Sequence, residues 1–355
     1  MTNYCNLAPV LQRKPALQPY PSIFSAHILH TLMLYKFHPV LLYLCLCFYF
    51  LQIQCSAKSP VSNMKNPSGE QILKNLAKGK DVFIQNETIN GDLDFTALAT
   101  TYRAAATAQQ YEVTGSLTLL NCTVKGKVTG YLLSKEGIKT VVFRKNFSCP
   151  GTRFEAEVNL RDAQIWGIAD FSGATFDKPV SFEGAIFKSR CVFNKATFYN
   201  EARFQTATFE AAANFMDSGF EGICGFQNAV FFTDAVFNNV NFLRYADFGN
   251  LSVRGHTFFN YARFGKQAVF GGSQFFGRAE WMSATFENQA DFSQTLFYGK
   301  TRLVKTALMA DVNFENATFI LGKPDAQQAS VTDKSKLLLN GARTASGSPL
   351  QISDF

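Results

Sequence analysis

The chain has little of what most enzymes and metalloproteins need. Of its 4 histidines, His27, His30 and His38 stand before Lys58, and only His256 lies beyond it. One histidine without a matching nucleophile or ligand pattern predicts neither a catalytic triad nor a metal centre. We therefore expect a protein that is not an enzyme, with no catalytic, cofactor-binding or metal-binding residues, no cofactor and no small-molecule substrate.

Cysteine is also scarce after the predicted leader, where it could form disulfides or bind metal. Of the 8 cysteines, four stand before Lys58, and beyond it only Cys122, Cys149, Cys191 and Cys224 remain. No pair has the CxxC spacing of a zinc or redox site. Cys191 and Cys224 fall on a small-residue core position, so we expect them to be buried as small apolar side chains. A bridge between Cys122 and Cys149 is left open.

Clustered positive charge is missing as well. The formal net charge is +7, yet acids and bases roughly balance between Phe171 and Phe319, and no run of Lys and Arg occurs. A nucleic-acid-binding patch needs such clustering. We expect no nucleic-acid partner, and paired carboxylates such as Glu221 and Asp234 are expected to be surface groups rather than a general acid and base.

The longest uncharged apolar run is too short to span a membrane in the usual way. Val40 to Ile53 contains 14 residues, whereas a transmembrane helix needs about 20. Lys36 precedes the run, and the small residues Cys55 and Ala57 follow it at the −3 and −1 places of a cleavage site. The segment therefore predicts a signal peptide within residues 1–57 and export to the periplasm, the cell envelope or the medium.

Three alternatives for this leader remain open. Translation from Met33 would give a more compact start, with Lys36 in the charged region before the apolar run. A lipid anchor on Cys55 is disfavoured because Gln54 occupies a place where a small residue is normally found. An uncleaved leader would keep the protein associated with the membrane.

Phenylalanine is as abundant as these other residues are scarce. The chain has 37 Phe against 12 Tyr and 2 Trp, which indicates one residue type reused at one structural position. Large apolar residues begin at Phe171, Phe176, Phe182 and Phe187 and continue at alternating spacings of 5 and 6 to Phe319. A small residue, usually Ala, stands two places before most of them. The sequence therefore has a repeat period of eleven, and each repeat contains two small-x-Phe units.

The spacing favours strands over helix. Residues two apart point to the same side of an extended strand, so the small residue and the Phe would both face inward. On a helix the same positions would scatter around the axis. Corners alternate between two residues (Ser172-Gly173) and three (Asp177-Lys178-Pro179), and like corners must stack on like. A closed coil then needs an even number of faces, and a coil of four faces contains two repeats.

The units Ala174-Thr175-Phe176, Ala185-Ile186-Phe187 and Ala196-Thr197-Phe198 resemble those of pentapeptide-repeat proteins, in a Phe-rich variant with an extra residue in alternate units. The resemblance covers about half of the chain and implies an all-β fold, a right-handed quadrilateral β-helix. We expect a leader at 1–57, a linker at 58–80, irregular coils with insertions at 81–146, the regular β-helix at 147–321, and a C-terminal cap or tail at 322–355.

The register can be extended upstream from Phe171, and two segments interrupt it. We place Ile165, Leu160, Phe154, Cys149, Phe143 and Ile138 on the inward positions of earlier coils. Ala97 to Gln110 is expected to be a short helix or a loop, and Leu133 to Gly137 a second excursion.

Three functions fit these features. The first is an exported, non-catalytic scaffold that binds a protein or an envelope component. The second, implied by relatives that mimic DNA and protect a type II topoisomerase, calls for an acidic surface. The third is a polysaccharide-acting β-helix enzyme. Outward aromatic and basic residues occur, but we interpret them as ordinary surface ladders and name no site among them; they are Tyr199, Arg203, Phe232, Arg244, Tyr245, Phe258, Tyr261 and Phe276.

Overall fold

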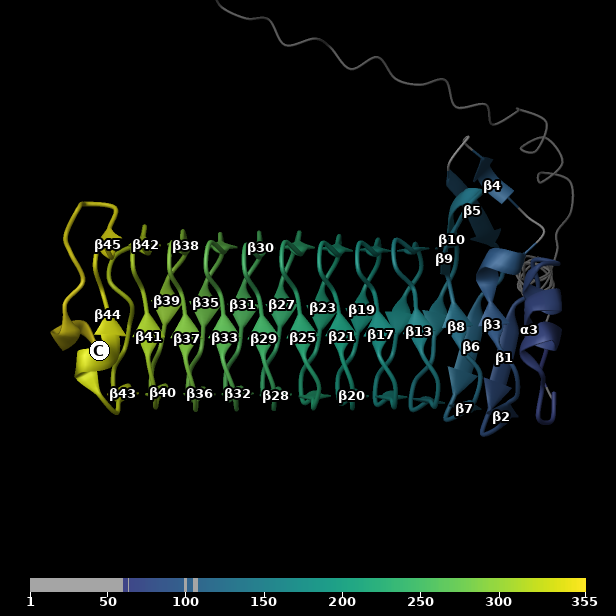
Figure 1. Ribbon diagram of the computed structural model, residues 1–355, viewed down its shortest axis with the longest axis horizontal. Coiled ribbons are helices and arrows are strands. Elements are labelled where there is room, and N and C mark those ends of the chain that lie inside the picture. The colour runs from purple at the N-terminus through teal and green to yellow at the C-terminus, as the bar shows by residue number, and fades with distance from the viewer. Residues whose placement is uncertain (1–59, 63, 99–100, 105–107) are drawn as a thin grey trace, which may run out of the picture. The chain divides into compact units, whose positions relative to one another are not determined.

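The computed structural model describes residues 60–62, 64–98, 101–104 and 108–355. The chain divides into two units at Ala57, and the predicted leader, with its apolar run, Met33 and Cys55, lies outside the described residues. The described residues from 60 onward belong to one solenoid of short strands joined by tight corners (Figure 1). The predicted fold class is confirmed.

Four sheets run along the solenoid, one on each side, and their regular coils pair in parallel. Face 1 contains ten strands, from β1 (Val82–Gln85) to β39 (Thr301–Arg302), and face 2 contains eleven, from β2 (Thr88–Ile89) to β43 (Ser330–Val331). Face 3 contains eleven, from β3 (Leu93–Asp94) to β44 (Leu337–Leu338). Face 4 runs from β4 (Thr101–Ala104) to β45 (Arg343–Thr344).

Each regular coil visits the four faces in the same order with strands of two residues. One regular coil consists of β15 (Ala169–Asp170), β16 (Thr175–Phe176), β17 (Val180–Ser181) and β18 (Ile186–Phe187). Ala169 pairs with Cys191 of β19 (Cys191–Val192), which confirms that one coil contains two repeats. The same register continues to β42 (Thr318–Phe319).

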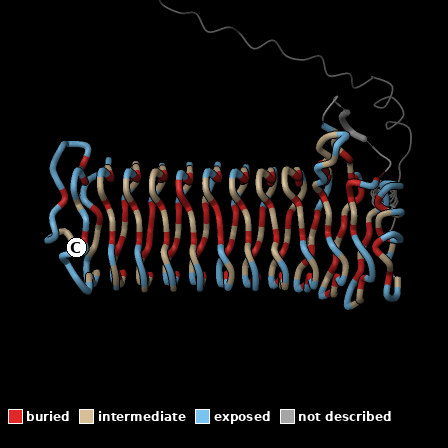
Figure 2. The backbone as a smooth tube through the Cα atoms, in the orientation of Figure 1, coloured by how far each residue is buried: buried red, intermediate tan, exposed pale blue. Residues whose placement is uncertain are grey.

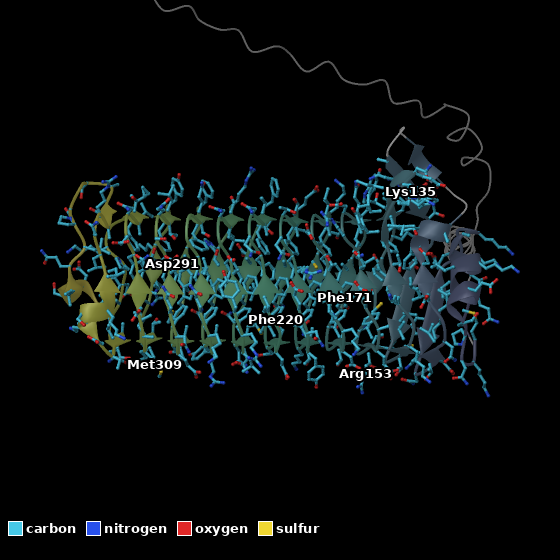
Figure 3. All side chains as sticks on the ribbon, viewed as in Figure 1. Lys135, Arg153, Phe171, Phe220, Asp291 and Met309 are labelled. Carbon is cyan, nitrogen blue, oxygen red and sulfur yellow. The ribbon has the colours of Figure 1, made fainter. Side chains whose placement is uncertain are left out.

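Stacked phenylalanines fill the interior. On face 2, Phe198 lies between Phe176 and Phe220, with ring centroids 5.0 and 4.5 Å apart and nearly parallel planes. Rings from faces 1 and 3 meet edge to face across the core, as Phe193 and Phe204 do. Each buried Phe contributes roughly 1.5–3 kcal/mol from burial alone. Figure 2 shows buried residues recurring along every coil, and Figure 3 labels Phe171 and Phe220, both of which are fully buried.

The two-residue corners explain why Gly, Asn and Asp recur between the Phe positions. Ala174 N donates a hydrogen bond to Phe171 O across the corner, and Gly173 has a φ of +62°. A left-handed residue recurs at this place in each later regular coil at both two-residue corners, for example at Gly184 and Asn228. Glycine adopts this conformation without strain and asparagine with little. The three-residue corners separate faces 2 and 3 and faces 4 and 1.

Both ends of the solenoid are covered, which corrects part of the predicted domain plan. The sequence predicts a linker over residues 58–80, but helix α3 (Gly69–Leu76) lies there. Ser68 and Gln71 form a capping box that begins the helix, and Ile72 and Leu76 are buried against the first coil. The Pro, Asn and Ser content that suggested a linker instead supplies the turn and the helix cap.

Residues 322–355 form a cap rather than a free tail. β43, β44 and β45 continue faces 2, 3 and 4 for one more, wider coil. The ring of Phe355 packs on Phe314 with centroids 5.2 Å apart, and Leu350 is buried. The sequence lacks the repeat here because each segment between strands is longer, although the strand pairing continues.

The two insertions form a small projecting sheet. β4 pairs antiparallel with β5 (Ala108–Val113), β5 pairs with β10 (Gly137–Phe143), and β10 pairs antiparallel with β9 (Tyr131–Ser134). The prediction of a helix or loop from Ala97 to Gln110 was therefore wrong, because β10 offers an edge for β5 to pair with. Ile138 was also misplaced: it lies half-buried in this sheet, whereas Phe143 is in the core. Figure 3 shows Lys135 on the projection.

All four cysteines beyond the leader are buried free thiols. Cys122 and Cys149 are therefore not bridged in this structure. Cys191 and Cys224 lie on the small-residue position of faces 1 and 3, as predicted, and burial raises the pKa of both thiols well above its ordinary value.

Candidate interaction surface

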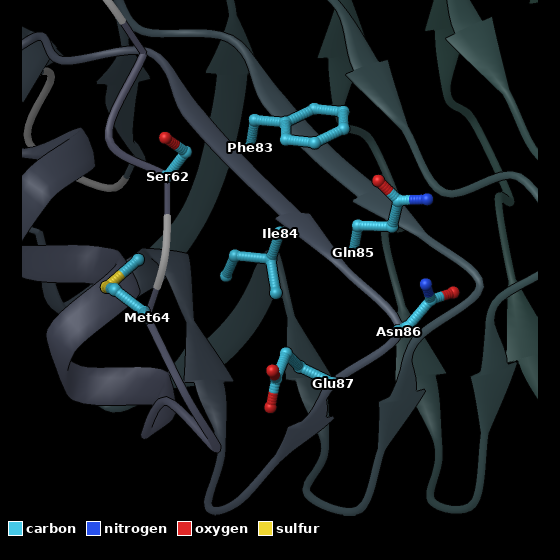
Figure 4. A pocket seen from close by; sticks show the side chains of 7 residues that line it. All are labelled: Ser62, Met64, Phe83, Ile84, Gln85, Asn86 and Glu87. Carbon is cyan, nitrogen blue, oxygen red and sulfur yellow. The ribbon is translucent and has the colours of Figure 1, made fainter.

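A solid core directs the search for a site to the outside of the solenoid. One hollow, of about 280 Å³, lies at the N-terminal end beside β1 and is lined by Ser62, Met64 and residues 83–87 (Figure 4). Within the described segments, no group of three or more His, Cys, Asp or Glu side chains could hold a metal ion. Glu221 and Asp234 come from opposite three-residue corners, so the solenoid does not bring them together.

The outward aromatic and basic residues named from the sequence do not form one patch. Tyr199, Arg244 and Tyr245 belong to the corner between faces 2 and 3, whereas Phe232 and Phe276 belong to the corner between faces 4 and 1. Arg203 and Phe258 lie on faces 3 and 1, and Tyr261 on a two-residue corner. The fold therefore divides this set among different sides of the solenoid.

The 4–1 corner, defined here as the three residues between each face 4 strand and the next face 1 strand from 144–146 to 298–300, carries a ladder of its own. Its first position recurs once in every coil, so these side chains stack in one line. The line reads Arg144, Trp166, Lys188, Glu210, Phe232, Arg254, Phe276 and Tyr298. Sequence reasoning missed it, although a search at the period of a whole coil would have found it.

Neighbouring rungs of this ladder contact one another. The Arg144 guanidinium lies 3.8 Å from the centre of the Trp166 ring, and Lys188 Nζ lies 5.7 Å from it. Arg254 lies 4.3 Å from the centre of the Phe232 ring. Phe276 and Tyr298 stack with centroids 4.6 Å apart and planes 4° from parallel. At least one face of each of these rings is thus covered by a neighbouring rung.

The 4–1 corner is mainly basic. It contains seven basic residues and two acids, Glu210 and Asp234. Lys188 Nζ pairs with Glu210 at 3.0 Å, and Asp234 accepts a hydrogen bond from His256 N at 2.7 Å. Arg190, Arg254 and Lys300 are exposed and form no ion pair with any described residue. Three positive charges along this corner are therefore available to a partner.

The diagonally opposite corner has the reverse balance. The 2–3 corner, residues 155–157 to 309–311 between faces 2 and 3, contains seven acids and three bases, Lys178, Arg244 and Lys266. Some acids are paired, as Asp177 is with Arg153 at 2.8 Å and Glu287 with Arg263. Arg153 and Met309 mark this side along the lower edge of Figure 3. The solenoid is thus more basic along one edge than along the opposite one.

A hollow continues the 4–1 corner towards the C-terminal cap. It measures about 480 Å³ and includes Arg278, Lys300, Arg302 and Lys323. The carboxylate of Glu280, which is nearly buried, pairs with Arg278 at 3.0 Å and with Arg302 at 3.4 Å. Ile320 and Leu321 follow the last rung and are exposed. The corner therefore ends in an apolar tip flanked by bases.

Face 3 holds a separate polar cluster. Asp247 accepts hydrogen bonds from Tyr245 Oη at 2.8 Å and from Gln227 Nε2 at 2.6 Å. Burial and the Asp247 carboxylate raise the pKa of Tyr245 to about 12. The hydrogen bonds hold this cluster in place on the face, and it shows no nucleophile or base free to react.

A family model described as "Pentapeptide repeats (9 copies)" matches residues 167–208, which form the first fully regular coils of the solenoid. None of the curated proteins compared with the chain matches it. Among the described helices, none has the length and apolar character needed to cross a membrane.

Proposed function

We propose that this chain, a pentapeptide-repeat protein, is an exported and non-catalytic scaffold that binds a protein or another component of the cell envelope through the outside of its solenoid. The observation that carries the proposal is the contrast between inside and outside. The interior contains mostly Phe as its large side chain and is tightly packed, whereas the 4–1 corner presents an ordered ladder that contains aromatic and basic side chains. Aromatic residues and Arg are enriched at protein interaction surfaces.

Export rests on the apolar run from Val40 to Ile53 and the small residues after it. The envelope is proposed as the place of action because a scaffold with a cleaved or lipidated leader meets its partners there. If the leader is retained, the same surface would act at the membrane.

Charge weighs against the DNA-mimicking alternative. A protein that imitates the duplex needs dense negative charge along its length, yet the chain is basic overall and the 4–1 corner is mainly basic. A polysaccharide-acting enzyme would need convergent carboxylates in a cleft, and the carboxylates of the 2–3 corner lie on a convex edge where several are paired with arginine.

Cell fractionation with intact-mass measurement tests the proposal directly. A C-terminally tagged chain should be found outside the cytoplasm, beginning near Lys58 or carrying lipid on Cys55. An intact chain in the soluble cytoplasmic fraction would contradict the export part of the proposal. Photo-crosslinking from position 254 of the 4–1 corner, compared with position 266 of the 2–3 corner, then tests which edge carries the partner.

A further inference from the structure

We infer that the 4–1 corner is a peripheral membrane-binding edge that lies along the surface of a bilayer containing anionic lipids. The inference rests on the proposed function in one respect, the use of the outside of the solenoid for binding, and goes further by naming the partner surface. It is drawn from the shape, the chemistry and the charge of the corner.

The shape fits a flat partner. Because the coils repeat in register, the first corner position of each coil falls on one straight line, with rungs roughly 4.8 Å apart. The ladder stands where two flat faces meet, and the hollow of about 480 Å³ lies beyond its rungs, at the C-terminal end. An edge of this kind can touch a plane along its whole length, whereas a small ligand would need a concavity.

The exposed groups are those that favour the membrane interface. Trp166, Phe232 and Phe276 are 38%, 40% and 42% exposed, and Leu321 at the tip is 64% exposed. Arg190, Arg254 and Lys300 alternate with them and have no acidic partner among the described residues. Aromatic and apolar side chains enter the headgroup region, while neighbouring cations attract anionic lipids.

The contacts of the rings count against nucleic acids and sugars as partners. Nucleic-acid bases bind aromatic residues by stacking on open ring faces, and sugar rings also pack against faces. Here one face of Trp166 and one face of Phe232 are covered by arginine, and Phe276 and Tyr298 each cover one face of the other, so fewer ring faces are open to stacking. Lipid needs no open ring face, so the exposed parts of these rings can enter the membrane interface without breaking these contacts.

The charge difference between the two edges sets the orientation. With the 4–1 corner towards an anionic surface, the acidic 2–3 corner faces away from it. Opposite faces of the solenoid are roughly 10 Å apart, so the diagonal exceeds the Debye length of about 8 Å at physiological salt. Repulsion of the acidic corner is therefore screened, while the basic corner is in contact.

Trp166 makes the test specific to this edge. The chain has 2 tryptophans, and the other, Trp281, is fully buried. The full chain is mixed with vesicles of phosphatidylcholine alone, or of phosphatidylcholine with roughly 30 mol% phosphatidylglycerol. The anionic lipid gives the vesicles a negative surface potential of tens of millivolts. Acrylamide quenching then reports whether Trp166 becomes protected. Insertion of the apolar leader by itself would leave Trp166 accessible.

Two matched triple variants decide the outcome. Arg190→Gln, Arg254→Gln and Lys300→Gln together should weaken binding to anionic vesicles about a hundredfold, at roughly fivefold for each basic residue. Lys178→Gln, Arg244→Gln and Lys266→Gln remove the same charge from the 2–3 corner, also without breaking an ion pair, and should change binding by less than about threefold. Both variants should keep the wild-type circular dichroism spectrum.

The inference is overturned if Trp166 stays accessible on anionic vesicles, if both triple variants lose affinity equally, or if a soluble acidic polysaccharide protects Trp166 at concentrations where the vesicles do not. Failure here leaves the scaffold proposal testable by fractionation and crosslinking, because a protein partner could use the same edge. A cytoplasmic chain would remove the export proposal while leaving the vesicle result unchanged.

Discussion

Thr206 has a left-handed backbone conformation that its β-branched side chain disfavours. Its φ is +56°, and it is the one β-branched residue among the described residues with a positive φ. Equivalent corners carry Gly173, Gly184 and Asn228. The left-handed conformation costs an L-residue roughly 1–2 kcal/mol, and Asn relieves part of this cost through its short polar side chain. Thr206→Asn should therefore stabilise the solenoid by about 1 kcal/mol.

The side chain of Thr206 gives up little in this exchange. It is exposed, and its one hydrogen bond runs from Oγ1 to the adjacent Gln205 O at 2.6 Å. A gain of about 1 kcal/mol corresponds to about fivefold slower amide exchange in residues 204–209 if they open locally, and to a rise of about 2–4 °C in Tm if the whole solenoid melts together.

Two substitutions control for composition. Thr208→Asn lies two residues away in β22 (Thr208–Phe209), where the backbone is extended and Asn is disfavoured, so it should lower stability or leave it unchanged. Asn228→Thr places the strained residue at an equivalent corner and should cost about as much as Thr206→Asn gains. The reasoning fails if Thr206→Asn and Thr208→Asn shift stability in the same direction.

Three further outcomes are expected. Phe226→Ala removes a ring stacked between Phe204 and Phe248 at 4.7 and 5.2 Å, and it should lower the free energy of unfolding by about 3–5 kcal/mol. Phe232→Ala on the exposed corner should lower it by less than about 1 kcal/mol. Equal shifts of the denaturant midpoint in the two variants would contradict the packing of the core. Cys191 and Cys224 should resist thiol reagents at pH 8 until the chain unfolds, because burial raises their pKa, and rapid labelling of the native protein would refute their burial. Tyr245 should ionise at about pH 12 in a spectrophotometric titration and at a lower pH in Asp247→Asn, where burial still raises its pKa. Since its folded pKa is raised, its contribution to stability is complete below pH 10 and is lost as the pH rises towards 12.

The pattern that forms most of the solenoid repeats over a few residues, and such short-range patterns can be read from a sequence. The alternation of 5 and 6 between Phe171 and Phe319 determined the strand positions, the inward faces and the length of the coil. It did so because every regular coil packs similar side chains against the coils next to it, so the structure of one repeat predicts the structure of the others. The caps and the projecting sheet follow no repeat, and there the sequence misled: α3 was expected to be a linker, and β4 and β5 a helix or loop.

The 4–1 corner also shows the difference between what the sequence predicts and what the tertiary structure decides. The residues of the 4–1 corner are plain in the sequence, and nothing in the two-unit repeat distinguishes them from those of the 2–3 corner. Closure of the coil into four faces brings Trp166, Phe232 and Phe276 onto one edge and sends Tyr199 and Tyr245 to the opposite one, a grouping that the sequence shows only when it is read at the period of a whole coil. The sequence by itself determined which residues point inward, because strand alternation is a local property. The tertiary structure decided which outward residues are neighbours, because residues one full coil apart meet only when the coils stack.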